Sequence, residues 1–207
     1  MALIKNYAQM RAAYPQLQHW NEVLEMVFRS PNPAVLNLKA SQFLLDDMAK
    51  LLPQGKLINT CCIRISHVLN QIGANKITKN TTDKVRYFPG CADRTTLAKG
   101  NYILAVREMS AYMRAKYGAP LSILKYKQGI SSTDALMWKR EHGDAKRATF
   151  MSAIALKTGI VVLFRPGINV GGTGTFSGHV DLWDMGRAFH DDSVTSTANQ
   201  IEFWAVD

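Results

Sequence analysis

The 207-residue chain has only three cysteines, which argues against both a disulfide-rich protein and a zinc-binding protein. Cys61 and Cys62 are adjacent, and neighbours in sequence do not form an unstrained disulfide. Cys91 brings the number to three, and no C-x-x-C pair is present. An odd number of cysteines without such pairs is typical of neither a disulfide framework nor a zinc site. The cysteine chemistry that the sequence leaves open is a reactive thiol.

Other features are also missing. No apolar run approaches the ~18 residues that span a bilayer, so we expect no membrane insertion. The segment 1–6 lacks the basic, apolar and small-residue regions of a secretory signal peptide. We therefore expect a protein that stays in the cytoplasm or leaves by a route without a cleaved signal. The glycine-rich segment 171–178 has no G-K-[ST], which argues against a phosphate loop, and we expect no cofactor and no metal.

The charge is strongly positive, with a formal net charge of +9. The simpler interpretation is a basic soluble surface. The functional interpretation is attraction to a polyanion, either a nucleic acid or an anionic cell-wall polymer.

The order of the predicted elements favours an α+β fold. Apolar residues recur at helical spacing over 1–29, with a break at Pro15, and over 103–117. A further short helix or lid is predicted within 134–148. Three strands are predicted after the helical half of the chain, over residues 159–165, 179–184 and 201–206. The first of them is expected to end at Pro166-Gly167. Helices followed by antiparallel strands are typical of α+β proteins.

Cys61 is the first candidate for chemistry, because a polar turn precedes it and an apolar helix follows it. The amide groups and dipole at a helix N-terminus lower the pKa of a cysteine there. A cysteine nucleophile also needs a base. His67 lies six residues on, about 120° around the helix, which predicts a surface or supporting role. His179 opens a predicted strand and is the better candidate.

A lone histidine on a strand is more often structural than catalytic, so spacing alone leaves the Cys61–His179 pairing open. Asp181 shares a strand face with His179, because side chains alternate along a strand. It is one candidate for the group that orients the imidazole.

Two motifs resemble a known family. The segment 59–66, N-T-C-C-I-R-I-S, resembles the N-x-C-x-I-R-[MI]-S of the type VI secretion amidase effectors, family four, and the V-L-N of that family matches 68–70. The segment 178–183, G-H-V-D-L-W, resembles its second signature, G-H-[VI]-x-L-W. The resemblance covers about residues 40–207, with both motifs in the family's order.

The resemblance implies a papain-like, NlpC/P60-related fold, in which a nucleophile helix packs on an antiparallel sheet. It implies a peptidoglycan amidase that cuts between D-glutamate and meso-diaminopimelate in stem peptides. Such effectors leave the producer cytoplasm through the type VI system, with its delivery component, and act in the periplasm of a rival bacterium. A cognate immunity protein protects the producer.

Carried over residue by residue, the resemblance makes Cys61 the nucleophile, since the spacing to I-R selects it over Cys62. It makes His179 the base. Alignment on Gly186 selects Asp191 as the third member, with Asp181 as the competitor.

The chain departs from the family pattern at Cys62, where a proline or small residue is usual. It also departs in its length, which predicts a single domain over 1–207 with a helical extension over 1–40. Two other functions remain as alternatives: a housekeeping cell-wall endopeptidase of the same fold, and a basic nucleic-acid-binding module.

Overall fold

A computed structural model describes the following parts of the chain: residues 3–15, 61–78, 85, 87–89, 100–103, 105–125, 145–169, 175–189, 198 and 200–207. The chain forms two compact units. One contains Met1–Tyr7 and Lys116–Asp207, and the other contains Ala8–Ala115. Each unit is described by itself below.

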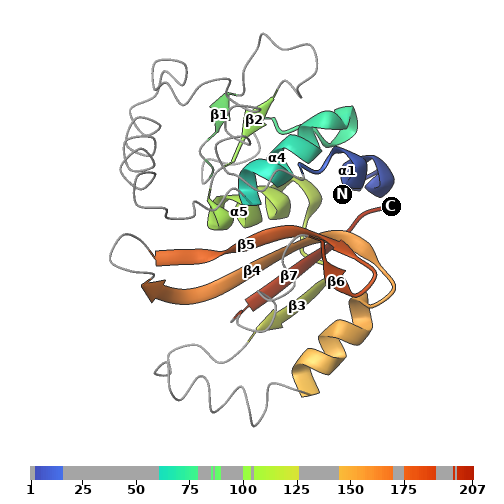
Figure 1. Cartoon of the computed structure of the whole chain (residues 1–207), viewed down its shortest axis with the longest axis vertical. Coiled ribbons are helices and arrows are strands. Elements are labelled where there is room, and N and C mark those ends of the chain that lie inside the picture. The colour runs from blue at the N-terminus through green and yellow to red at the C-terminus, as the bar shows by residue number, and fades with distance from the viewer. Residues whose placement is uncertain are drawn as a thin grey trace. The chain divides into compact units, whose positions relative to one another are not determined.

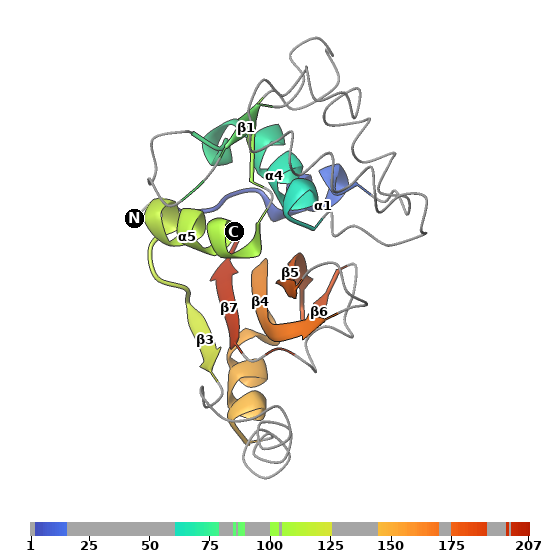
Figure 2. The same cartoon turned by 90° about the vertical axis from the view of Figure 1, so that its left-hand side faces the viewer.

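The first unit is built on a five-stranded sheet in the order β3-β7-β4-β5-β6, in which each strand is antiparallel to its neighbours (Figures 1 and 2). The strands are β3 (Ser122–Lys125), β4 (Thr158–Asn169), β5 (Thr175–Asp184), β6 (Arg187–Ala188) and β7 (Gln200–Ala205). Together with the helices, this sheet confirms the predicted α+β class.

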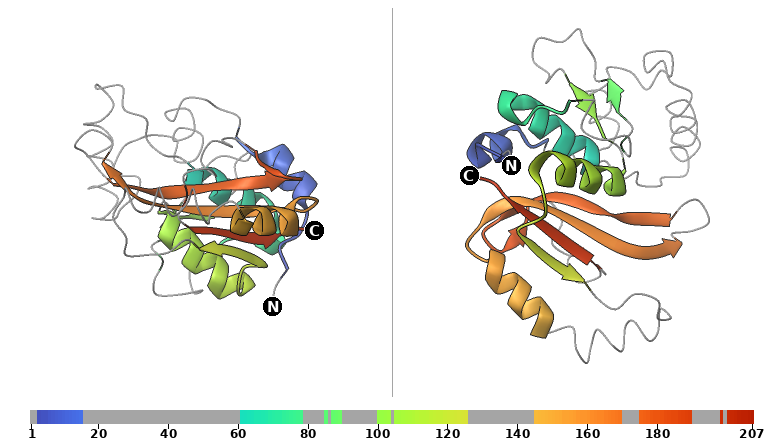
Figure 3. Two further views of the ribbon diagram at one scale, coloured as in Figure 1. Left: turned by 90° about the horizontal axis from the view of Figure 1, so that it is seen from below. Right: turned by 180° about the vertical axis from the view of Figure 1, so that it is seen from behind.

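The central strand β4 forms the most buried part of the sheet. Residues 160–163 of this strand are completely buried, as their continuous apolar run predicted. On one face, Val161 and Leu163 belong to a hydrophobic cluster with Phe150 and Ile154, which lie on a helix over residues 145–154. Figure 3 shows this helix beside the sheet. It only overlaps the end of the helix or lid predicted within 134–148, and residues 134–144 lie outside the described residues.

The hairpin of β4 and β5 is longer than predicted. Strand β4 does not end at Pro166-Gly167 but continues to Asn169, and β5 begins at Thr175 within the glycine-rich segment. The pairing register shifts between Phe164 and Ile168. Such an irregularity accommodates a proline, which cannot donate to a regular ladder, so the strands pair again beyond it.

The described part of the second unit is mainly helical. It holds most of α1 (Tyr7–Ala13) and α5 (Val106–Tyr117), all of α4 (Cys61–Gln71) and η3 (Gly73–Asn75), and a small sheet of β1 (Phe88–Pro89) and β2 (Asn101–Tyr102). As predicted, α5 stops before Gly118, whose positive φ of 84° suits a helix C-terminus.

The helix predicted from residue 1 begins later than expected. Ile4 forms a parallel bridge with Val206, and the Asp207 amide donates to the Ile4 carbonyl at 3.2 Å. Helix α1 then runs from Tyr7 and ends before Pro15. Ile4 is therefore bridged to the segment just after β7 instead of lying in a helix, because its backbone groups are used in that bridge. Residues 16–40 of the predicted extension lie outside the described residues, and its role stays a prediction.

None of the helices in the described ranges is long and apolar enough to span a bilayer.

Candidate active site

Cys61 is the first residue of helix α4, as the sequence predicted. Its side chain is buried, and so is that of Cys62, with their Sγ atoms 3.9 Å apart and neither in a disulfide. The partial positive charge of the helix N-terminus acts within the first turn and favours an anion there. Cys61 thus lies at the end of the helix to which the dipole attracts an anion.

Cys62 has an environment that opposes ionisation. Burial raises the pKa of the Cys62 thiol well above its ordinary value, and the contact with Cys61 raises it further. Because the thiolate rather than the thiol is the nucleophile, a cysteine held in the protonated form is poorly suited to attack. This difference supports the choice of Cys61 between the two neighbours.

The polar residues of the first motif hold helix α4 in place. The Ser66 hydroxyl accepts a bond from the Ile103 amide at 3.0 Å and lies 3.3 Å from the Ile103 carbonyl. The Asn70 amide group donates to the Asn101 carbonyl at 2.8 Å, and its oxygen accepts from the Ile77 amide at 3.1 Å. A buried polar group must find such partners, so Ser66 and Asn70 are structural members of the motif.

His67 is buried rather than on the surface, which corrects one half of the expectation for this residue. Its Nδ1 lies 3.4 Å from the Tyr102 hydroxyl, and its Nε2 lies 3.3 Å from the Gln71 amide nitrogen. Burial lowers the pKa of His67 to about 4. These contacts indicate that His67 supports the helix and does not act as a base.

The low pKa of His67 predicts a loss of stability in acid. Well above pH 6.5 the imidazole is neutral in both the folded and the unfolded protein. As the pH falls from 6.5 towards 4, the unfolded chain takes up a proton that the folded protein excludes. The free energy of unfolding should therefore fall by about 3 kcal/mol over this range. Urea unfolding at several pH values measures it. His67→Gln should flatten the curve between pH 6.5 and 4, and an identical curve for this variant would contradict the assignment.

His179 lies on β5 opposite Leu163 of β4, and its side chain is buried. Its Nε2 lies 3.5 Å from Oδ2 of Asp181, which confirms the predicted shared strand face. The other carboxylate oxygen of Asp181 accepts a bond from the Leu182 amide at 2.8 Å. Asp181 is completely buried and is therefore fixed beside the imidazole.

The other residues of the second motif position this strand. Gly178 has a φ of 147°, and a Cβ atom there would lie 2.0 Å from the Leu163 carbonyl oxygen. Trp183 donates from Nε1 to the Ile154 carbonyl at 3.1 Å and so ties β5 to the helix over 145–154. Sequence reasoning did not assign a role to either residue. A glycine directly before a candidate histidine was the available signal for the first.

The described residues include Cys61 in the helical unit and His179 with Asp181 in the sheet unit. Asp191 and Cys91 lie outside the described residues. Among the residues that are described, no three His, Cys, Asp or Glu side chains gather in a way that could hold a metal ion.

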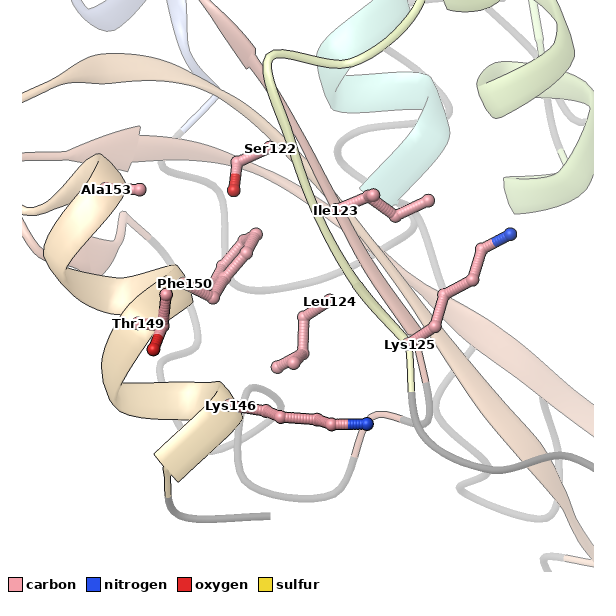
Figure 4. A pocket seen from close by; sticks show the side chains of 8 residues that line it. All are labelled: Ser122, Ile123, Leu124, Lys125, Lys146, Thr149, Phe150 and Ala153. Atoms are coloured by element: carbon pink, nitrogen blue, oxygen red, sulfur yellow. The ribbon is translucent and has the colours of Figure 1, made fainter. Parts of the chain in front are cut away.

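A cavity of about 430 Å³ lies between β3 and the helix over 145–154. Figure 4 shows Leu124 and Phe150 pointing toward each other across it. Its lining is Ser122, Ile123, Leu124, Lys125, Lys146, Thr149, Phe150 and Ala153. Because it contains none of the candidate catalytic residues, we assign it no part in the reaction.

The chain is similar to known proteins. It resembles the Tae4 chain of the type VI effector–immunity complex Tae4–Tai4 from Salmonella Typhimurium, at 20% identity over 98% of each chain with a TM-score of 0.59. It also resembles the type VI effector Tae4 from Enterobacter cloacae, at 18% identity over 100% of this chain and 98% of that chain, with a TM-score of 0.56. These likenesses show the fold, and they are consistent with the papain-like expectation. No protein with a curated description matches.

A family model described as "Type VI secretion system (T6SS), amidase effector protein 4" matches residues 57–204. The matched range includes Cys61 and both sequence motifs, so the resemblance seen in the sequence is confirmed. The chain therefore belongs to the Tae4 family of type VI secretion amidase effectors.

Proposed function

We propose that the protein hydrolyses the amide bond between D-glutamate and meso-diaminopimelate in peptidoglycan stem peptides, with Cys61 as nucleophile and His179 as base. The observation that supports this most is the family match, since it spans both residues. The position of Cys61 at the start of α4 and the raised pKa of Cys62 support the same choice of sulfur.

The proposed reaction is an acyl transfer in two halves. His179 accepts the proton of the Cys61 thiol, and the thiolate attacks the γ-carbonyl carbon of D-glutamate. Backbone amides at the start of α4 stabilise the oxyanion. The C–N bond then breaks as the protonated His179 donates its proton to the leaving amine. In the second half, His179 takes a proton from water, the resulting hydroxide attacks the thioester, and Cys61 leaves as the thiol after regaining the proton.

We propose Asp191 as the residue that orients His179. The 3.5 Å contact of His179 with Asp181 is long for a charge-assisted hydrogen bond, which is typically about 2.7–2.9 Å. In addition, Asp181 already accepts from the Leu182 amide. These two features favour a second carboxylate as the orienting group, and the family resemblance offers Asp191.

A comparison of two variants tests the third residue. Asp191→Asn is expected to lower kcat by about 10³–10⁴-fold, because an amide favours the wrong imidazole tautomer. Asp181→Asn, which keeps its size and its oxygen for the Leu182 amide, should stay within about tenfold of the parent. Initial rates on a purified muropeptide measure both. The reverse order of effects would assign the orienting role to Asp181.

Digestion of purified muropeptides tests the reaction itself. The expected products are one fragment that ends in D-glutamate with a new carboxyl group and one that begins with meso-diaminopimelate with a new amine. Mass spectrometry of the fragments identifies the bond. Cleavage at another amide would overturn the proposed specificity, and intact muropeptides would overturn the proposed substrate.

We also propose that a cognate immunity protein binds this effector, and that the type VI system delivers it from the producer cytoplasm to the periplasm of a target cell. The solved Salmonella Typhimurium structure is described as an effector–immunity complex, which supports the first part. Growth of cells that carry the effector directed to their own periplasm, with and without a co-expressed immunity candidate, tests the first part. Killing of target cells by producers with and without a functional type VI system tests the second.

A further inference from the structure

Arg64 is a buried charged residue in helix α4, with only 3% of its surface exposed. Its Nη1 donates to the carbonyl of Pro15, just after helix α1 ends. A guanidinium stays charged at every pH at which proteins fold. Burying a charge costs free energy unless the charge is paired or hydrogen-bonded. The burial of Arg64 therefore indicates a role for its charge in addition to packing.

Helix α4 places Arg64 about one turn from the candidate nucleophile. Arg64 follows Cys61 by three residues, and side chains three apart on a helix are neighbours, with Cβ atoms about 5–6 Å apart. Side chains on a helix also lean toward its N-terminus, which directs the stem of Arg64 over the turn that contains Cys61. A nearby arginine favours a thiolate over a thiol, and the effect is stronger where water is excluded.

The bond to Pro15 gives Arg64 a second effect. Helix α1 also contacts the segment after α4 through Met10, whose sulfur lies 4.0 Å from the Asn75 amide nitrogen. Arg64 therefore joins the first turns of α4 to the chain that leaves α1. Since Arg64 and Pro15 are both buried, the guanidinium is held in one place.

We propose that Arg64 is a positioning residue that stabilises the Cys61 thiolate and fixes the first turns of α4 against the backbone at Pro15. The proposal rests on the proposed function in one respect, that Cys61 is the nucleophile. It assigns to this motif residue an effect on the reaction that is exerted through Cys61.

The pH dependence of Cys61 alkylation tests the proposal without any peptidoglycan. Full-length protein carrying Cys62→Ala and Cys91→Ser leaves one thiol for iodoacetamide. In this background, Arg64→Met is expected to move the midpoint of the rate–pH curve up by about one pH unit, a tenfold change in the thiolate equilibrium. Arg64→Lys, which keeps the charge, should move it much less. Arg11→Met, which removes an exposed arginine of the same unit, should leave it unchanged.

The possible results separate the role of the charge from that of the fold. A midpoint that is the same in Arg64→Met and the parent overturns the proposal, even if hydrolysis is lost. Equal shifts in Arg64→Met and Arg64→Lys also overturn it, because the charge would then be irrelevant. If Arg64→Met does not fold by circular dichroism, Arg64→Gln takes its place. Failure of the proposed function would appear instead as hydrolysis that survives Cys61→Ala.

Discussion

Cys61→Ala is expected to lower the rate of muropeptide hydrolysis by at least about 10³-fold, because loss of a nucleophile removes the covalent route altogether. Cys61 is the first residue of α4, where the helix terminus favours the thiolate. Alanine fits the same helical turn, so the loss should not come from unfolding. Mass spectrometry of the products at fixed times measures the residual rate.

Cys62→Ala is the matched control, since it removes the same atoms one residue away in an equally buried position. Its rate should stay within about tenfold of the parent. The reason is the raised pKa of Cys62, which keeps that sulfur protonated. The assignment would be wrong if Cys61→Ala kept full activity and Cys62→Ala lost it.

Gly178→Ala is expected to destabilise the protein by about 3 kcal/mol or more, through both overpacking and backbone strain. A Cβ atom at this position would lie 2.0 Å from the backbone oxygen of Leu163, and the φ of 147° is unfavourable for alanine. The backbone of β4 cannot move away without breaking the ladder with β5. Since His179 follows directly, any relief of the clash should also displace the imidazole and lower activity.

Gly73→Ala provides the control for this prediction. A Cβ atom there would meet nothing within 4 Å, so the change in stability should stay within about 0.5 kcal/mol. Urea unfolding of the parent and both variants gives the midpoints. Equal midpoints for Gly178→Ala and Gly73→Ala would show that the close approach of β4 and β5 is not as described.

Local patterns in the chain were enough to place several elements. The polar turn followed by apolar residues predicted a helix from Cys61, and α4 begins at that residue. The apolar run after Gly159 predicted a strand buried on both faces, and β4 is buried in this way. Hydrophobic periodicity reports such features because it depends on residues a few positions apart.

Strand ends and the surroundings of polar residues depended on contacts between distant positions. Strand β4 passes Pro166 because β5 pairs with it beyond that point, which no local pattern reveals. His67 is buried because Tyr102 lies beside it from 35 residues further along the chain.

The sequence by itself determined the family, the candidate nucleophile and the candidate base, since these rest on short motifs. It also determined the order of the elements, which rests on local hydrophobic patterns. The tertiary structure decided which motif residues serve the fold. Arg64 meets the Pro15 carbonyl across 49 residues, and Ser66 meets Ile103 across 37. The physical reason is that a buried polar group is satisfied by whatever the fold brings to it, and sequence spacing does not encode that partner.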